Sequence, residues 1–321
     1  MEIAQGIHLI SGLVGARPLQ LYLLLGSRRR VLLDTGCAPD PDRMVFPYLR
    51  DIGLSAADLD LVINTHCDMD HCGGNHAVKL ANPKVQITCG AKDRALIEDP
   101  QTMWDLRYNA YEKDHGIHYS ESERQGIFAA MGSPQPVDAT WSGGEILDLD
   151  DGWRVEIFHT PGHSEGHLAL FDPRSRTLLS GDAVHGSMYP DVEGNPVLCP
   201  TYLQVDSYRA TIRFLESMQI KCLATCHWPL KRGCAVQGFL AESLAFVQRT
   251  EQLLLDDLRN SPAGCTLREL ILHLGPELGG WPRSVDTELV YALAGHLQSL
   301  VSVHKVLAVP NPKGMVFKLV G

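Results

Sequence analysis

The sequence predicts an α/β fold in which helices pack against β-sheets. Two observations support this prediction. Short runs rich in Ile, Leu, Val and Tyr, typical of strands, alternate with helical segments along residues 1–232. Hydrophobic residues make up 45% of the 321 residues and charged residues 21%, so the chain can bury a large core.

The predicted strands are apolar runs that end at Gly-containing or otherwise turn-rich segments. In the first half of the chain they lie at residues 7–11, 19–25, 30–33, 59–64 and 85–88. In the second half they lie at residues 155–158, 168–171, 177–179 and 222–225. Helical patterns fall between them, at residues 41–49, 76–80, 91–97 and 208–218.

Residues 98–139 interrupt this alternation. The segment carries several aromatic residues among charged ones, which predicts a helical insertion. Three of these rings, Trp104, Tyr108 and Tyr111, are candidates for an apolar wall over the functional site. The alternative is that the insertion is a helical hairpin with a small core of its own.

The last part of the chain, residues 234–321, differs from the main domain at residues 1–233. Helical patterns at 235–258, 267–274 and 287–300 precede two strand-like runs around a Pro-Asn-Pro-Lys-Gly turn. Helices followed by a hairpin predict a small winged-helix-like module. Five basic and four acidic residues from position 261 onward leave it nearly neutral, so packing or dimerisation is expected rather than nucleic-acid binding.

Composition excludes several classes of protein. A formal net charge of −10 argues against nucleic acid as a general partner, because phosphate binding needs a surplus of Lys and Arg. No apolar run approaches the roughly 18 residues of a membrane helix, and the first residues lack a secretory pattern. Nine cysteines are too sparse for a disulfide scaffold, so we expect a cytoplasmic protein with reduced thiols.

Four potential metal ligands follow the predicted strand at 59–64. They are His66, Asp68, Asp70 and His71. Alternate side chains of an extended segment point to the same side, so the first three can line one side of a site. A turn after Asp70 brings His71 to it. Imidazole and carboxylate are the usual protein ligands of zinc, iron and manganese.

Three further candidates each stand where a later strand gives way to a loop. His163 follows the strand at 155–158, Asp182 follows that at 177–179, and His227 follows that at 222–225. Ligands on loops at one edge of a rigid sheet can fix a metal centre.

Together these motifs resemble the five-part pattern of the metallo-β-lactamase fold superfamily, over roughly residues 1–232. The first part is similar to Leu32-Leu33-Asp34-Thr35-Gly36. The resemblance implies a four-layer αββα sandwich with a dinuclear centre at one edge of its two sheets. Carried over, the first ion takes His66, Asp68 and His163; the second takes Asp70, His71 and His227; Asp182 bridges both; and Asp34 supports the ligands.

Asp68 departs from the family pattern, which usually has His there. A carboxylate at this place resembles diiron members of the superfamily, which carry Glu. We therefore expect two divalent ions, zinc first, with iron or manganese as alternatives.

The implied activity is hydrolysis of an ester-like bond (ester, lactone, thioester or amide) in a small-molecule substrate. Two divalent ions would hold a hydroxide and polarise the carbonyl, and Asp70 would orient the nucleophile and pass a proton to the leaving group. Asp68 motivates an alternative, a diiron redox enzyme, although no flavodoxin-like or rubredoxin-like segment accompanies it. A metal-free scaffold is a third alternative, but converging carboxylates repel one another without a cation.

For the other conspicuous His, Cys and Ser residues we expect an auxiliary or a packing role. His185 is a candidate for contacting substrate or orienting a ligand, and His167 is expected to brace its loop. Cys67, Cys72, Cys222 and Cys226 are interpreted as packed thiols. Residues 162–166 match Gly-x-Ser-x-Gly, but a strand follows where a nucleophile elbow needs a helix.

Overall fold

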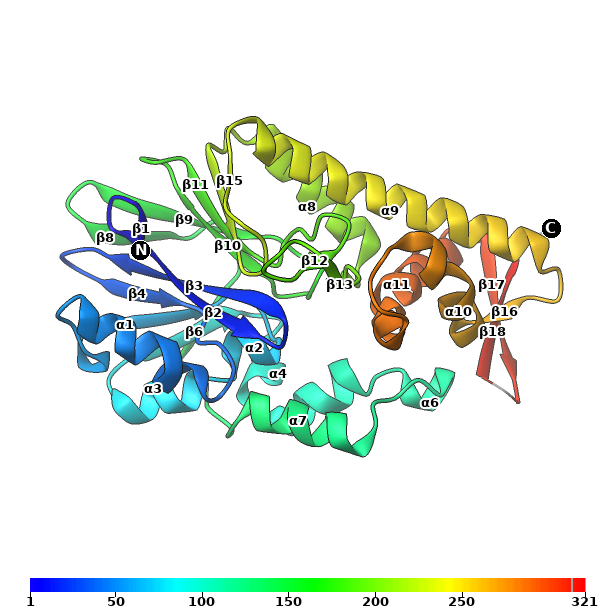
Figure 1. Ribbon diagram of the computed structural model, residues 1–321, viewed down its shortest axis with the longest axis horizontal. Coiled ribbons are helices and arrows are strands. Elements are labelled where there is room, and N and C mark those ends of the chain that lie inside the picture. The colour runs from blue at the N-terminus through cyan, green and yellow to red at the C-terminus, as the bar shows by residue number, and fades with distance from the viewer. Residues whose placement is uncertain (313, 321) are drawn as a thin grey trace.

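The chain folds into four layers, as the sequence predicts. The computed structural model describes residues 1–312 and 314–320; Lys313, in the predicted turn of the C-terminal hairpin, lies outside the described residues. Two sheets face each other and helices cover both outer faces (Figure 1). The arrangement is the predicted αββα sandwich.

The first sheet has seven strands in chain order. Its first four strands are antiparallel, and the pairs from β4 onward are parallel. The predicted strands are all present, whereas the two edge strands of three residues each are too short for a sequence pattern. The strands are β1 (Glu2–Ala4), β2 (Ile7–Val14), β3 (Arg17–Leu25), β4 (Arg30–Leu33), β5 (Leu61–Asn64), β6 (Gln86–Gly90) and β7 (Ala139–Trp141).

The second sheet has six strands in the order β15-β14-β11-β10-β9-β8. Two short strands, β12 (Tyr189–Pro190) and β13 (Pro196–Leu198), pair beside it. The strands of the large sheet are β8 (Ile146–Asp150), β9 (Trp153–His159), β10 (Leu168–Asp172), β11 (Thr177–Gly181), β14 (Cys222–Thr225) and β15 (Lys231–Arg232).

The core between the sheets joins residues from both halves of the chain. Tyr22, Val31 and Ile63 of the first sheet pack against Ile157 and Leu170 of the second, all fully buried. Burial of each such aliphatic side chain stabilises the fold by about 1.5–3 kcal/mol. This packing holds the strand ends that carry the predicted ligands in register.

Helices pack on the outer face of each sheet through separate apolar clusters. The first sheet is covered by η1 (Pro41–Val45), α1 (Phe46–Asp51), α3 (Asn75–Ala81), α4 (Arg94–Glu98) and α7 (Glu121–Met131), with η2 (Ala56–Asp58) before β5. The second sheet is covered by α8 (Val205–Ser217) and the start of α9 (Cys234–Asn260). The predicted insertion is helical, with α5 (Pro100–Met103), the π-helical turn η3 (Trp104–Tyr108) and α6 (Glu112–His115) ahead of α7.

The C-terminal part consists of helices and a small sheet, and α9 runs from the second sheet to it (Figure 1). Its likeness to a winged helix and the domain boundary at residue 233 remain predictions. The elements are β16 (Cys265–Thr266), α10 (Leu267–Leu278), η4 (Arg283–Glu288), α11 (Leu289–Ser302), β17 (Val306–Asn311) and β18 (Gly314–Leu319), in a sheet ordered β16-β18-β17.

No helix within residues 1–312 and 314–320 combines the length and the apolar character that a span of the bilayer requires.

Gly295 marks the tightest contact between α11 and the main domain. A Cβ there would lie 1.9 Å from the backbone oxygen of Leu203. We therefore expect Gly295→Ala to lower the free energy of unfolding by about 1–3 kcal/mol, measured by urea denaturation, because α11 must move away. Gly238→Ala in α9 is the control: its Cβ meets open space, so the variant should be unchanged or more stable by up to about 1 kcal/mol. Equal stability of the two variants would contradict this packing.

Candidate metal centre

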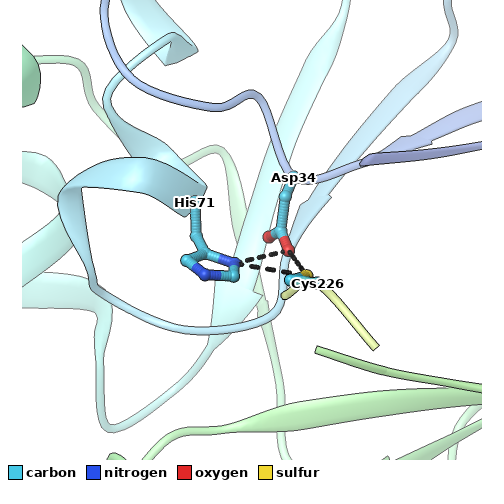
Figure 2. Close-up of side chains that lie close together, drawn as sticks. All are labelled: Asp34, His71 and Cys226. Atoms are coloured by element: carbon cyan, nitrogen blue, oxygen red, sulfur yellow. Dashed lines mark hydrogen bonds and ion pairs between the residues drawn. The ribbon is translucent and has the colours of Figure 1, made fainter. Parts of the chain in front are cut away.

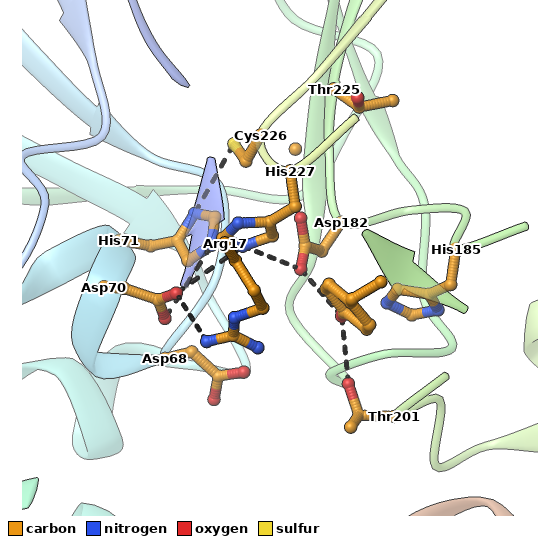
Figure 3. A network of polar contacts seen from close by, with 12 residues as sticks. Arg17, Asp68, Asp70, His71, Asp182, His185, Thr201, Thr225, Cys226 and His227 are labelled. Atoms are coloured by element: carbon orange, nitrogen blue, oxygen red, sulfur yellow. Dashed lines mark hydrogen bonds and ion pairs between the residues drawn. The ribbon is translucent and has the colours of Figure 1, made fainter. Parts of the chain in front are cut away.

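The predicted ligands converge at one edge of the two sheets. His66 and Asp68 follow β5, His163 lies between β9 and β10, Asp182 follows β11 and His227 follows β14. Asp70 and His71 belong to α2 (Met69–Cys72). Asp68 is partly buried and the others are buried. Figure 3 shows the side chains of Asp70 and His71 gathered with those of Asp182 and His227, which come from other segments of the chain.

The local geometry around Asp70 differs from the sequence-based prediction. Asp68 has extended backbone (φ −79°, ψ 150°), but α2 begins at Met69, so Asp70 and His71 lie on a helical turn. The prediction that three alternate residues share one side of an extended segment is therefore wrong for Asp70. The helix brings both residues to the site, because the N–H groups of His71 and Cys72 bond back to the carbonyl of Asp68.

Backbone carbonyls fix the orientation of two imidazoles. His227 Nδ1 donates to Pro18 O at 2.7 Å, and His163 Nδ1 donates to Thr201 O at 3.1 Å. A carbonyl only accepts, so each Nδ1 carries a proton and Nε2 is the ring nitrogen that faces the centre. Burial lowers the pKa of His227, which keeps this ring neutral at pH 7.

Asp34 orients the other two imidazoles. Its fully buried carboxylate accepts from His71 Nδ1 at 2.9 Å and from Thr65 Oγ1 at 2.8 Å (Figure 2). Thr65 Oγ1 in turn accepts from His66 Nδ1 at 3.0 Å. Asp34 also has a left-handed backbone, with φ of 63°, a conformation found mostly at functional sites for residues other than Gly. The structure thus places Asp34 where the resemblance put it, behind the ligands.

Cys226 completes this supporting cluster (Figure 2). Its Sγ lies 3.8 Å from both Asp34 Oδ2 and His71 Nδ1. Burial raises the pKa of Cys226 to about 12, so the sulfur stays a thiol rather than a metal-binding thiolate. Because His71 Nδ1 donates to Asp34, the ring presents Nε2 to the centre and the trio is a support rather than a second metal site.

Asp70, His71, His227 and Asp182 present acceptor atoms to one another. The ligand atoms of the first three lie within 4.8 Å of each other. His227 Nε2 is 3.5 Å from Asp70 Oδ2 and 3.4 Å from Asp182 Oδ2, while His71 Nε2 and Asp182 Oδ1 have no hydrogen-bond partner. Asp34 and Cys226 outweigh burial and raise the pKa of His71 well above its usual value, so without a metal ion this ring carries the positive charge of the set. A divalent ion would take the place of that proton, so this set of buried nitrogen and oxygen atoms fits a divalent ion.

The set formed by His66, Asp68 and His163 is different. Their ligand atoms also lie within 4.8 Å of each other. However, the buried guanidinium of Arg107, from η3, donates to both oxygens of Asp68, with Nη2 to Oδ2 at 2.8 Å. The same Nη2 lies 3.1 Å from His163 Nε2. Burial alone would raise the pKa of Asp68, but the Arg107 guanidinium outweighs burial and holds it well below its usual range.

The sequence analysis did not identify two arginines that lie at the centre. Besides Arg107, Arg17 at the start of β3 places Nη2 3.5 Å from Asp70 Oδ2 (Figure 3). Neither has a spacing that links it to the ligand motif, since Arg17 precedes the motif and Arg107 lies in the insertion. The only signal in the sequence is the extra carboxylate at Asp68, which calls for a further positive charge.

His185 and His167 flank the centre. His185 Nδ1 lies 3.1 Å from the hydroxyl of Tyr208, and its Nε2 has no partner. Ligand atoms of His163, Asp182 and His185 lie within 4.8 Å of each other. His167 Nε2 accepts from the backbone N–H of Asp182 at 3.1 Å, which agrees with its predicted role as a brace.

A cleft of about 470 Å³ opens over the centre. Asp68, Asp70, Asp182 and His227 lie at its base, and the insertion, the strand β13 and the C-terminal helices supply its walls. Of the three predicted wall aromatics, Tyr108 lines it. Trp104 packs against Tyr119 and Phe128, and Tyr111 packs against Tyr291. The apolar and aromatic lining residues are Val14, Ala16, Met69, Tyr108, Tyr119, Ile127, Tyr189, Val197, Leu198, Val285 and Tyr291.

Asp34→Asn tests whether the supporting network sets metal affinity. The amide keeps the size of the side chain but loses the charge that orients His71. We expect metal affinity to fall about 10- to 100-fold, measured by competition with a chromophoric chelator. Asp148→Asn, at an exposed position of β8, is the control and should leave affinity unchanged. Equal affinity in all three proteins would remove Asp34 from the metal-binding network.

Comparison with known proteins identifies relatives of the main domain. A family model described as the metallo-beta-lactamase superfamily matches residues 15–227. The acyl-coenzyme A thioesterase MBLAC2 of Gallus gallus is 24% identical over 209 residues, covering 58% of this chain and 66% of that protein. A hydroxyacylglutathione hydrolase of Thermosynechococcus vestitus is 22% identical over 140 residues, covering 44% and 40%. The chain thus spans only part of these curated relatives.

Solved structures share the fold over the whole chain. A metallo-beta-lactamase family protein from Thermus thermophilus covers 99% of this chain with a TM-score of 0.76 at 20% identity, and 100% of that protein is covered. A beta-lactamase domain protein from Burkholderia ambifaria covers 100% with a TM-score of 0.77 at 16% identity, and 93% of that protein is covered. The helices and small sheet after residue 233 therefore belong to an architecture that other proteins share.

Proposed function

Since the chain belongs to the metallo-beta-lactamase superfamily, we propose that it is a metal-dependent hydrolase of an ester-like bond, with thioesters as the preferred class. One observation carries this proposal: Asp70, His71, His227 and Asp182 present facing acceptor atoms at the base of a cleft. A divalent ion supplies a hydroxide nucleophile near neutral pH and polarises a carbonyl.

Asp70 is the proposed proton carrier. It lies at the base of the cleft with 5% of its surface exposed. Burial favours its neutral acid, but the positive charges of His71 and Arg17 outweigh burial and lower its pKa, so it is a carboxylate at pH 7. A carboxylate here can accept a proton from the nucleophile and return it to the leaving group.

The walls of the cleft favour an acyl substrate. The apolar side chains of Ile127, Val197 and Leu198 are suited to a hydrocarbon chain, and Arg17 adds a positive charge close to Asp70. The named activities of the curated relatives, on acyl groups carried by coenzyme A or glutathione, support a thioester.

Three earlier expectations remain predictions: zinc as the ion, with iron or manganese as alternatives; Asp68 as a metal ligand; and a homodimer. The diiron alternative requires Asp68 to bind iron. Both oxygens of Asp68 accept from Arg107, so no observation favours this alternative.

Metal removal tests the proposed activity. We expect a chelator to abolish hydrolysis of acyl thioesters and reloading with zinc, manganese or iron to restore it. His227→Ala should lose turnover at least 100-fold, because the ring supplies an acceptor to the ion. A panel of thioesters, esters and lactones, run beside an oxygen-consumption assay, identifies the class. Turnover that survives chelation, or oxygen uptake without hydrolysis, would contradict the proposal.

The wall of the cleft is tested by two aromatic variants. Tyr108→Ala should raise KM for the best thioester about 10-fold while kcat changes less, because Tyr108 lines the cleft. Trp104→Ala should instead lower the free energy of unfolding by about 3–5 kcal/mol, since this ring is buried among other aromatic rings. Tyr108→Phe is the control, because it removes only the hydroxyl that accepts from Met69 N–H. An unchanged KM in Tyr108→Ala would assign Tyr108 to packing.

A further inference from the structure

Arg107 occupies the space between two predicted ligands of the first ion. Its Nε and Nη2 donate to the two oxygens of Asp68, and Nη2 is 3.1 Å from His163 Nε2. His163 Nδ1 already donates to Thr201 O, and His163 Nε2 is occupied by contacts with Arg107 Nη2 at 3.1 Å and Asp68 Oδ2 at 2.9 Å. Of this set, only His66 Nε2 remains without a hydrogen-bond partner.

A metal ion and the guanidinium compete for the same acceptors. A divalent ion on His163 Nε2 would have to replace the Arg107 contact at 3.1 Å, and the two cations would repel each other strongly in a buried site. Both oxygens of Asp68 would also have to be shared with Arg107. The first set can therefore hold an ion only after Arg107 has moved.

The surrounding structure holds Arg107 in place. Only 6% of the residue is exposed, and Nη1 donates to the backbone oxygen of His163 at 3.3 Å. Its guanidinium lies 5.6 Å from the ring centroid of Tyr291, on α11 of the C-terminal part. The π-helical turn η3 that carries it is of a kind often found at functional sites. Moving Arg107 would leave a buried charge without partners.

The formal charges of the centre balance with one ion. Asp34, Asp68, Asp70 and Asp182 carry four negative charges, and one divalent ion with the Arg107 and Arg17 guanidinium groups carries four positive charges. Two ions together with both arginines would leave a net positive charge of two before any nucleophile is added. In the set that contains Asp70, the nearest guanidinium atom, Arg17 Nη2, is 3.5 Å from Asp70 and leaves His71 Nε2 and Asp182 Oδ1 unpaired.

Given the proposed metal-dependent function, we infer that the centre binds one divalent ion, held by Asp70, His71 and His227 with Asp182, and that Arg107 takes the place of the other. Arg107 is then a positioning residue that keeps Asp68 and His163 fixed beside the ion. This inference differs from the expectation of two ions, which rested on the family pattern without Arg107 and stays a prediction.

Metal titration tests this inference without an activity assay. The metal-free full chain is titrated with Zn²⁺ against a chromophoric chelator, and elemental analysis follows gel filtration. We expect one tight equivalent in the natural protein, one in His163→Ala, and loss of tight binding in His227→Ala. Two tight equivalents in the natural protein, or one retained in His227→Ala, would overturn the inference and leave the proposed hydrolase standing. No tight binding in the natural protein would refute both.

Arg107→Met removes the competing charge and frees Asp68 and His163. We expect this variant to bind a second equivalent of Zn²⁺, whereas Arg107→Lys, which keeps a positive charge, should bind one. Arg124→Met is the matched control: Arg124 belongs to the same insertion but contacts Glu121 and the rings of Trp104 and Phe128, so the variant should bind one equivalent. A folded Arg107→Met protein with one equivalent would overturn the inference. If Arg107→Met does not fold, the His163→Ala and His227→Ala titrations decide.

Discussion

Three carboxylates that line the base of one cleft are the constraint on which the rest of the site depends. Asp70 and Asp182 are buried and Asp68 is partly buried, so their mutual repulsion must be offset by positive charge at short range. The chain offers cations of its own in Arg107 and Arg17, and it leaves acceptor atoms facing one another where an ion fits. Metal binding and arginine placement are therefore two solutions to one electrostatic problem, used side by side.

Hydrogen bonds within the protein fix the orientation of the four imidazole rings without the help of a bound cation. Asp34 binds His71 directly and reaches His66 through Thr65, while backbone carbonyls hold His163 and His227. Each bond commits Nδ1 and turns Nε2 toward the centre. These rings emerge from strand ends that the core between the two sheets holds in register, so a packing interaction far from the cleft determines the geometry of the ligands.

The sequence was sufficient for the layers and for the edge of the sheets at which the candidate ligands gather, because both follow local patterns. Apolar runs mark β5, β11 and β14, and His66, Asp182 and His227 each follow such a run. The sequence was insufficient for the features that depend on tertiary contacts. The pairing of Arg107 with Asp68 and the pairing of β7 with β6 both join residues distant in sequence. The presence of Asp68 where the family usually has His was visible in the sequence, but its pairing with Arg107 was not.

The C-terminal part contacts the insertion that carries Arg107. Its charge balance gave no reason to bind nucleic acid, and packing was expected. Tyr291 lies beside the guanidinium of Arg107, and Glu288 accepts from the hydroxyl of Tyr119 at 2.8 Å, so this part clamps the insertion that delivers the arginine. Both residues also line the cleft. A change that loosens α11 would thus reach the centre through η3, which makes the C-terminal part a component of the site rather than an appended domain.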